Sequence, residues 1–528
     1  MDFDIVSLSR LQFALTALYH FIFVPLTLGL SILVAIMETV YVLTGRTLWR
    51  DMTKFWGGLF GINFAMGVAT GIVMEFQFGM NWSYYSHYVG DIFGAPLALE
   101  GLMAFFLEAT FVGLFFFGWE RLSRVKHLIV AWCVALGSNF SALWILIANG
   151  WMQNPVGAQF NPQTMRMEMT DFFAVLINPM AQTKFVHTVT AGYVTAAVFV
   201  LGISACYLLK GRYPALAKRS MTVAATFGLV SALALVALGD ESGYLVAKHQ
   251  KMKLAAMEAM WKTEPAPAAF TAFGFPDQAA RETHYAVHVP WLMGLIGTRS
   301  LTTEIPGIEA LVEQAERRIR DGLTAYDALQ RIRAASKTGA GIPPQAQADF
   351  ETHGHALGHA LLLKRYTDDP RQASPEQIRQ AAWDTVPQVA PLFWAFRLMV
   401  GLGVFLIVLT AVFSWLSIQR RLDAHRWLLK IAAYSIPLPW IAIECGWIVA
   451  ELGRQPWVIE GVLPTAVAVS NLGASTVLFT IIGFVLIYTV LLLIELKLML
   501  RAIRKGPDIE APDGADSRIT AATPAPAH

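Results

Sequence analysis

Four side chains that can bind iron lie far apart in the chain, each inside a strongly apolar segment. They are His20, His187, Met399 and Glu444. Ionisable groups inside a membrane helix are costly and rare, so each one indicates a function. Haem sites in helix bundles use His and Met side chains from facing helices. Taken singly, however, a His or Met is often a packing residue and a Glu often belongs to a proton path. The residue types are therefore compatible with a haem site without establishing one.

Two glutamates in one apolar segment indicate proton movement. Glu100 and Glu108 are eight residues apart, which in a regular helix is a rotation of about 80° and a rise of about 12 Å. Burial makes carboxyl groups easier to protonate, so two of them at different depths can pass protons along a path. A polar stripe in the next apolar segment could continue this path: Ser138, Asn139, Ser141 and Asn149. The alternative for the serines and asparagines is hydrogen bonding between helices.

The composition predicts the elements that carry these residues. Of 528 residues, 55% are hydrophobic and 15% are charged, whereas soluble domains carry about 25% charged residues. The predicted fold is therefore all-α, a polytopic membrane helix bundle with nine transmembrane helices. The nine apolar stretches that are long enough to span a bilayer are about 12–41, 56–80, 95–119, 127–149, 184–209, 221–239, 389–416, 429–450 and 472–500.

The distribution of basic residues predicts the orientation of these helices. Lys and Arg gather after the first, third, fifth, seventh and ninth stretches, at 46–54, 121–126, 210–219, 420–430 and 501–505. By the positive-inside rule the N-terminus is periplasmic and the C-terminus cytoplasmic. His20 then lies about 12 Å in from the outer surface. His187, Met399 and Glu444 fall at a similar depth, so all four candidate ligands share one outer layer.

A long polar insertion divides the chain into four parts. Residues 1–239 carry transmembrane helices one to six, 240–388 form a periplasmic loop, 389–505 carry helices seven to nine, and 506–528 form a cytoplasmic tail predicted to be disordered. Within the loop, 311–332 has the spacing of an amphipathic helix, with breakers at 265–267 and 339–344. Cys133, Cys206 and Cys445 lie in apolar stretches, which predicts buried free thiols.

Several segments in order along the chain resemble subunit I of cytochrome bd-type quinol oxidases. The similarity covers all nine helices and much of the outer loop, and indicates the branch with the long quinol-binding loop. The matching segments are Ser9-Arg10-Leu11-Gln12-Phe13 before His20, Gly61-Ile62-Asn63-Phe64, Glu75-Phe76-Gln77-Phe78-Gly79, Asn81-Trp82, Glu100 to Glu108, Gly150-Trp151-Met152-Gln153-Asn154-Pro155 and Gly453-Arg454-Gln455-Pro456-Trp457.

The resemblance implies three haems. His187 and Met399 match the axial ligands of a low-spin haem b, with Arg397 beside it. His20 and Glu444 match the ligands of the high-spin haem b and of haem d. Haem d is expected at His20, although some relatives use haem b in its place.

The remaining matches concern the haem environment, protons and quinol. Trp440 matches a residue between haems. The resemblance places Glu100 near the oxygen-reducing iron and places Glu108 and Ser141 on the cytoplasmic proton route. Lys253 and Glu258 match residues of quinol oxidation, where a carboxylate can take a proton and an ammonium can hold a quinone oxygen. On a polar loop, such a pair would otherwise be expected to be solvated.

The resemblance implies an enzyme of the bacterial inner membrane, a quinol:dioxygen oxidoreductase. Ubiquinol or menaquinol would be oxidised at the periplasmic side, and O2 would be reduced to water with cytoplasmic protons, which generates a proton motive force without pumping. The expected partners are a second large subunit, one or more small single-helix subunits and the lipid membrane. No nucleic acid is expected.

Two other classes of membrane protein remain as alternatives. A diheme cytochrome b that exchanges electrons with quinone would normally show paired His residues on two helices. A proton-coupled transporter would use Glu100, Glu108 and Glu444 to bind an ion. The absence of an inverted repeat argues against a transporter.

Overall fold

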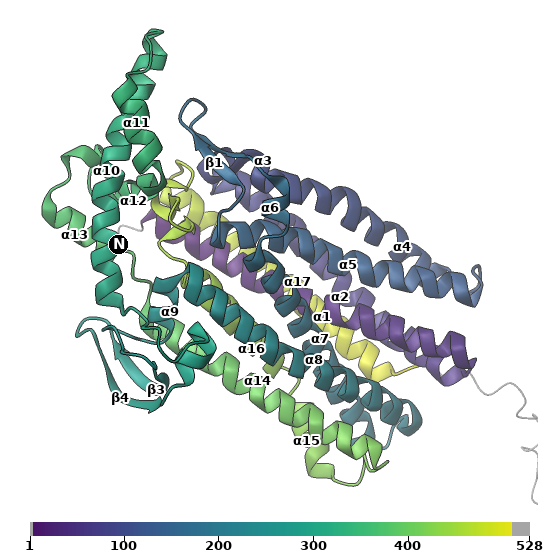
Figure 1. Cartoon of the computed structure of the whole chain (residues 1–528). Helices are drawn as coiled ribbons and strands as arrows, with labels where there is room; N and C mark the ends of the chain where they lie inside the picture. Colours follow the sequence, from purple (N-terminus) through teal and green to yellow (C-terminus); the bar gives the residue numbers. More distant parts are fainter. Residues whose placement is uncertain (1–3, 509–528) are drawn as a thin grey trace, which may run out of the picture.

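The computed structural model describes residues 4–508, and long helices dominate it (Figure 1). Within this part of the chain nine helical stretches are long and apolar enough to cross a membrane, which confirms the predicted number. They are Ile5–Thr44 (α1), Thr47–Met80 (α2), Ser83–Phe117 (α3, Ser83–Leu99, and α4, Phe106–Phe117), Arg124–Gln153 (α5), Phe172–Leu209 (α6, Phe172–Leu176, and α7, Pro179–Leu209), Pro214–His249 (α8), Val389–Ile418 (α14), Arg426–Leu452 (α15, Arg426–Tyr434, and α16, Leu438–Leu452) and Ala474–Lys505 (α17).

Local residue choices set the ends of these helices. The Asp4 carboxylate accepts hydrogen bonds from the backbone N–H groups of Val6 and Ser7 at the start of α1. Gly45 ends α1 with a φ of 68°, a left-handed conformation that glycine adopts without strain. The hydroxyl of Ser123 caps the start of α5 in the same way as Asp4 caps α1.

Small residues bring α1 and α7 very close together. A Cβ atom on Gly29 would overlap the carbonyl oxygen of Gly192, and a Cβ on Gly192 would lie 2.9 Å from the carbonyl oxygen of Pro25. Glycine at a membrane helix crossing allows this backbone approach. The two helices that carry His20 and His187 are therefore fixed directly against each other.

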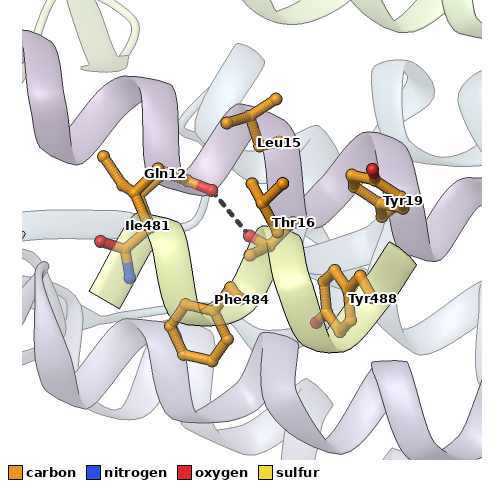
Figure 2. A pocket seen from close by; sticks show the side chains of 8 residues that line it. Gln12, Leu15, Thr16, Tyr19, Ile481, Phe484 and Tyr488 are labelled. Atoms are coloured by element: carbon orange, nitrogen blue, oxygen red, sulfur yellow. Dashed lines mark hydrogen bonds between the residues drawn. The ribbon is translucent and has the colours of Figure 1, made fainter. Parts of the chain in front are cut away.

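α17 packs against α1 on another side of the bundle (Figure 2). Tyr19 and Thr489 share a hydrogen bond of 2.9 Å between their hydroxyl groups. Side chains fill the recess between the two helices so completely that no space for a water molecule is left.

The helix formed by α3 and α4 is not regular. A π-helical segment, Glu100–Phe105, separates them. The wider turn changes the angle between Glu100 and Glu108 from the value expected for a regular helix. π-segments occur frequently at functional sites, and this one begins at a candidate proton-carrying residue.

The outer segment begins later than expected because α8 continues to His249. It then contains α9 (Lys251–Met257), α10 (Ile308–Thr338), α11 (Pro344–His353), α12 (Leu357–Leu361) and α13 (Pro375–Trp383), which lie at one end of the bundle (Figure 1). α10 confirms the amphipathic helix predicted at 311–332, and Gly339 ends it with a φ of 68°. Residues 509–528 of the predicted tail lie outside the described residues, and the orientation of the termini stays a prediction.

Within residues 4–508, three short antiparallel hairpins add strands to the predicted all-α fold. They are β1 (Ala158–Asn161) with β2 (Arg166–Met169), β3 (Phe270–Asp277) with β4 (Glu282–Val289), and β5 (Trp457–Ile459) with β6 (Leu463–Pro464). All three lie in connecting segments outside the nine long helices.

Candidate functional site

His20 is held in one orientation on α1. Its Nδ1 lies 2.8 Å from the hydroxyl of Thr70 on α2, and that hydroxyl donates its hydrogen to the carbonyl oxygen of Met66. The Thr70 oxygen is therefore the acceptor for the Nδ1–H group, which leaves Nε2 unprotonated. A metal-binding histidine typically donates the hydrogen of its other ring nitrogen to such an acceptor, which orients the ring. Gly71 leaves room beside the ring, since a Cβ there would lie 3.2 Å from Cε1.

His187 and Met399 also lie beside glycines. The Nδ1 atom of His187 is buried, and the imidazole lies within hydrogen-bonding range of the backbone of Leu238 on α8. A Cβ on Gly239 of α8 would lie 3.8 Å from the Cε1 atom of His187. A Cβ on Gly446 of α16 would lie 3.2 Å from the sulfur of Met399. The glycines leave space next to both side chains, as a planar cofactor would require.

Glu444 is the most unusual of the four candidate ligands. Both of its carboxylate oxygens are buried, and neither has a hydrogen-bond partner in the described part of the chain. A buried carboxylate without a partner is costly, and binding to a metal ion would offset that cost. Trp440, one turn earlier, donates its indole N–H to the carbonyl oxygen of Ile22 at 2.7 Å, which fixes α16 against α1 near His20.

The predicted proton-route residues meet where α5 packs against α3 and α4. The hydroxyl of Ser141 donates a 2.7 Å hydrogen bond to the carboxylate of Glu100. Glu108 is buried against α5, where a Cβ on Gly137 would lie 2.9 Å from its Cγ. Asn149 does not join this group, because it binds Glu451 at 3.1 Å. The predicted stripe on α5 is therefore divided into two separate polar regions.

Glu258 and Arg397 form a buried ion pair between the outer segment and α14. A guanidinium nitrogen of Arg397 lies 2.9 Å from a carboxylate oxygen of Glu258, and the two side chains are 7% and 1% exposed. Arg397 also donates to the carbonyl oxygens of Met257 and Thr271. Burial raises the pKa of Glu258 to about 7, although Arg397 opposes the change. The residue predicted beside the haem thus contacts a residue predicted to oxidise quinol.

Lys253 is buried, unlike the solvated lysine that a polar loop would suggest. Its ammonium group donates to the side-chain oxygens of Gln153 at 2.6 Å and Gln250 at 2.8 Å, and to the carbonyl oxygen of Ala450 at 2.9 Å. An ammonium group has three hydrogens, so these acceptors use all of its donor capacity. Burial lowers the pKa of this group. A direct bond to a quinone oxygen would require one of the three acceptors to be released.

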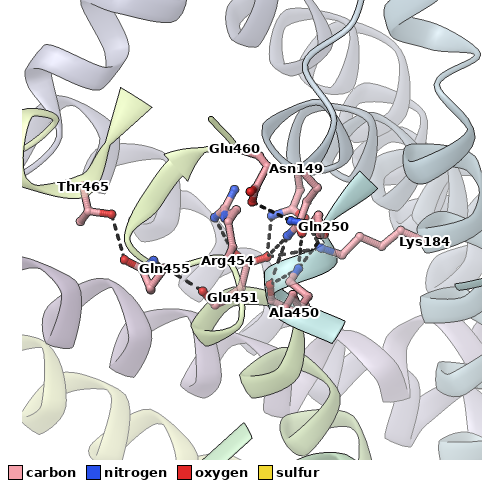
Figure 3. A network of polar contacts seen from close by, with 11 residues as sticks. Asn149, Lys184, Gln250, Ala450, Glu451, Arg454, Gln455, Glu460 and Thr465 are labelled. Atoms are coloured by element: carbon pink, nitrogen blue, oxygen red, sulfur yellow. Dashed lines mark hydrogen bonds and ion pairs between the residues drawn. The ribbon is translucent and has the colours of Figure 1, made fainter. Parts of the chain in front are cut away.

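A polar network around Lys253 contains residues that the sequence did not single out (Figure 3). The carboxylate of Glu451 pairs with Lys184 at 3.3 Å and with Arg454. Gln250 donates to the carboxylate of Glu460 at 3.0 Å. The network joins α5, α7, α9 and α16. The segments at 150–155 and 453–457 matched the family, but nothing in the sequence indicated that they meet.

Glu451 is a second candidate carboxylate ligand on α16. It follows Trp447 by four residues, the same spacing that separates Glu444 from Trp440. The ring of Trp447 lies 4.8 Å from that of Phe21, next to His20. Glu444 lacks a hydrogen-bond partner in residues 4–508, whereas Glu451 pairs with two cationic side chains. The structure therefore favours Glu444 as the carboxylate that is free to bind iron.

Removing the Lys253 ammonium should destabilise the protein. We expect Lys253→Ala to cost about 1–3 kcal/mol, because it leaves buried acceptors without a donor. Lys251→Ala, at an exposed position of the same short helix, should change stability by less than about 0.5 kcal/mol. Thermal unfolding of the two purified variants measures the difference. Equal melting temperatures would contradict the structural role of Lys253.

Comparisons with known proteins identify the family. The family model for cytochrome bd terminal oxidase subunit I matches residues 8–507. Cytochrome bd-II ubiquinol oxidase subunit 1 of Escherichia coli (strain K12) is 52% identical and covers 96% of this chain and 97% of its own length. Cytochrome bd ubiquinol oxidase subunit 1 of Bacillus subtilis (strain 168) is 37% identical, over 95% and 94%. The bd oxidase structure from Geobacillus thermodenitrificans has a TM-score of 0.76 at 26% identity, over 96% of this chain and 99% of that chain. The chain therefore belongs to the family of cytochrome bd terminal oxidase subunit I.

Proposed function

We propose that this chain is the haem-bearing subunit of a terminal quinol oxidase in the bacterial inner membrane. It oxidises quinol at the outer face and reduces O2 to water with protons from the cytoplasm. Family membership supports this reaction and disfavours the diheme cytochrome b and the transporter. The observation that carries the residue assignments is the carboxylate of Glu444, whose two oxygens are buried within the helix bundle and have no hydrogen-bond partner in residues 4–508.

Four side chains would hold the haems. His187 and Met399 are proposed for a low-spin haem b, and His20 with Glu444 for a high-spin haem b and haem d. Gly239 and Gly446 leave space for a haem beside His187 and Met399. The Nε2 atom of His20 is free to bind iron, because Nδ1 carries the hydrogen bond to Thr70. When bound, the haems supply one-electron transfer and an iron that binds O2. Trp440 keeps α16, and with it Glu444, in place against α1.

Quinol oxidation releases two protons, and Glu258 is proposed to accept one of them. Burial raises its pKa to about 7 while Arg397 at 2.9 Å stabilises the ionised form. The carboxylate can therefore be ionised and still take a proton near neutral pH. Arg397 holds this carboxylate close to the helix segment that carries Met399. Lys253 is proposed to fix the segment of Glu258 against α5 and α16 through its hydrogen bonds to Gln153 and Ala450.

Protons for water formation are proposed to reach the site through Glu108, Ser141 and Glu100. Ser141 already binds Glu100, and its hydroxyl can both accept and donate a proton. Because quinol protons leave on the outer side and these protons enter from the inner side, the reaction separates charge without a pumping step.

The proposed partners are a second large subunit and at least one small single-helix subunit, with quinol and O2 as substrates. The E. coli relative at 52% identity is named a ubiquinol oxidase. A B. subtilis relative named a putative menaquinol oxidase subunit is 25% identical. Ubiquinol is the better supported of the two quinols on this similarity.

Replacing Met399 tests the low-spin haem. We expect Met399→Leu to abolish the low-spin haem signal in the reduced-minus-oxidised spectrum, because Leu cannot ligate iron, while the high-spin signals stay. Met37→Leu, a similar change in the buried part of α1, preserves side-chain volume and should leave the spectrum unchanged. A normal low-spin signal in Met399→Leu would refute the assignment.

Two matched variants test the carboxylate ligand on α16. We expect Glu444→Gln to lower the content of one high-spin haem, since a neutral amide is a poor ligand for iron, and Glu451→Gln to retain it. Pyridine haemochrome analysis of both purified complexes measures this content. If only Glu451→Gln loses the haem, the ligand is Glu451.

The pKa of Glu258 predicts a pH dependence. Below pH about 7 the carboxyl group is mostly protonated and cannot accept a proton. The rate of quinol oxidation should therefore rise with pH through about 7, and Glu258→Gln should remove this limb and lower the rate without changing haem content. Glu313→Gln, at an exposed position of α10, is the control. An unchanged pH profile in Glu258→Gln would exclude this role.

A further inference from the structure

The β3–β4 hairpin carries large apolar side chains on its surface. Phe273, Phe275 and Val287 are 43%, 51% and 55% exposed. Trp291, just after β4, is 62% exposed, and Leu295 follows it at 52%. Contiguous apolar surface of this kind marks an interaction site.

β3 lies along the first turns of α14 and runs in the opposite direction. Near the tip of the hairpin, Gln278 accepts a 3.1 Å hydrogen bond from the backbone N–H of Val389, the first residue of α14. Towards its open end, the carbonyl oxygen of Thr271 accepts one of 2.8 Å from Arg397. Figure 1 shows the hairpin beside the end of the bundle where α14 starts. The tip is thus at the outer end of α14, and the open end is about 12 Å further along that helix.

Two tryptophans indicate where α14 enters and leaves the lipid. Trp394 and Trp415 are both exposed, and the 21 residues between their positions (415 − 394) span about 32 Å of helix. The hydrocarbon core of a bilayer is about 30 Å thick, and tryptophans are enriched at both of its boundaries. The ring of Trp394 lies 5.3 Å from that of Phe273 and 5.8 Å from that of Phe275. The middle of the hairpin is therefore level with the outer boundary of the lipid.

We propose that the β3–β4 hairpin is seated in the outer leaflet of the membrane, with Trp291 and Leu295 in contact with lipid. These two residues lie beyond the deeper, open end of the hairpin. The apolar surface continues the exposed apolar face of α14, where Leu398 is 47% exposed. The occupant of this surface is lipid, because the surface has the depth and the aromatic residues of a membrane boundary.

The position of the hairpin in the membrane also has a consequence for quinol oxidation, and this consequence rests on the proposed function. Thr271 in β3 binds Arg397, and Arg397 pairs with Glu258. The strand that contacts the lipid boundary therefore also fixes the carboxylate proposed to accept the quinol proton. A quinol with a long isoprenoid tail stays dissolved in lipid, and the hairpin would hold Glu258 at the level where its head group arrives.

Spin-label accessibility tests the placement without requiring turnover. Trp291→Cys is labelled in the complete oxidase complex, after Cys133, Cys206 and Cys445 are replaced by Ala, in nanodiscs of phosphatidylethanolamine and phosphatidylglycerol. We expect the label to collide more with O2, which concentrates in lipid, than with a water-soluble nickel chelate. A label at Ser336, exposed on α10, should show the opposite preference. Nickel accessibility equal to that at Ser336 would overturn the proposal, as would protection from both reagents, which indicates a protein partner.

A kinetic comparison tests the consequence for substrate. Val287→Ser with Phe275→Ser should raise the KM for a long-tailed quinol in nanodiscs several-fold. The KM for a short-tailed, water-soluble quinol and the haem content should stay unchanged. Equal changes for both quinols would overturn the role in presenting lipid-dissolved substrate. The spin-label experiment measures the position of the hairpin and does not depend on quinol oxidation. An error in the proposed function would therefore change the kinetic result and leave the spin-label result as it is.

Discussion

The ion pair between Arg397 and Glu258 joins a membrane helix to the outer segment 139 residues earlier in the chain. Both side chains are nearly inaccessible to solvent, so neither could be charged there without the other. Loss of one partner from a buried pair costs about 3–5 kcal/mol, because the remaining charge stays buried. Arg397 also donates hydrogen bonds to the backbone oxygens of Met257, Thr271 and, within α14, Phe393. One guanidinium therefore fixes α9, β3 and α14 together, and Met399 lies two residues further along α14.

Lys253 connects the outer segment to two further membrane helices, α5 and α16. Its acceptors come from α5 and α16 and from Gln250 beside α9. The neighbouring pair of Glu451 with Lys184 ties α16 to α7, and Arg454 binds the same carboxylate from just beyond the end of α16. Buried polar groups require partners, and here the partners belong to different helices. The ends of α5, α7 and α16 beside Lys253 are thus held by charge and hydrogen bonding, whereas α1 and α7 are held by glycine contacts closer to the middle of the bundle.

The sequence predicts the elements well and their contacts poorly, for physical reasons. Apolar length identifies all nine spans in the described residues, because lipid imposes the same requirement on each helix. The amphipathic spacing at 311–332 likewise predicts α10, because the pattern lies within one short stretch of the chain. The burial of Lys253 was not visible, because its acceptors lie up to 197 residues away. The spacing of Glu100 and Glu108 predicts the rotation of a regular helix, and nothing in the sequence indicates the π-helical segment that begins at Glu100. Glu451 repeats a spacing that the sequence contained, but only the contact of Trp447 with Phe21 makes it a candidate.

The division of the polar stripe on α5 bears on charge separation. Ser141 contacts Glu100, while Asn149 contacts Glu451 in the outer network. The seven residues between them, 142–148, are all apolar and span about 12 Å. A continuous polar stripe would have connected the inner proton route to the outer network beside Lys253. Under the proposed function, protons released from quinol could then return to the oxygen-reducing site without crossing the membrane, and no potential would be generated. The apolar interval on α5 opposes this return, because each proton would have to pass a stretch without side-chain carboxyl or hydroxyl groups. α5 thus contacts both the proposed proton route, through Ser141, and the network around Lys253, through Asn149, while an apolar interval separates the two contacts.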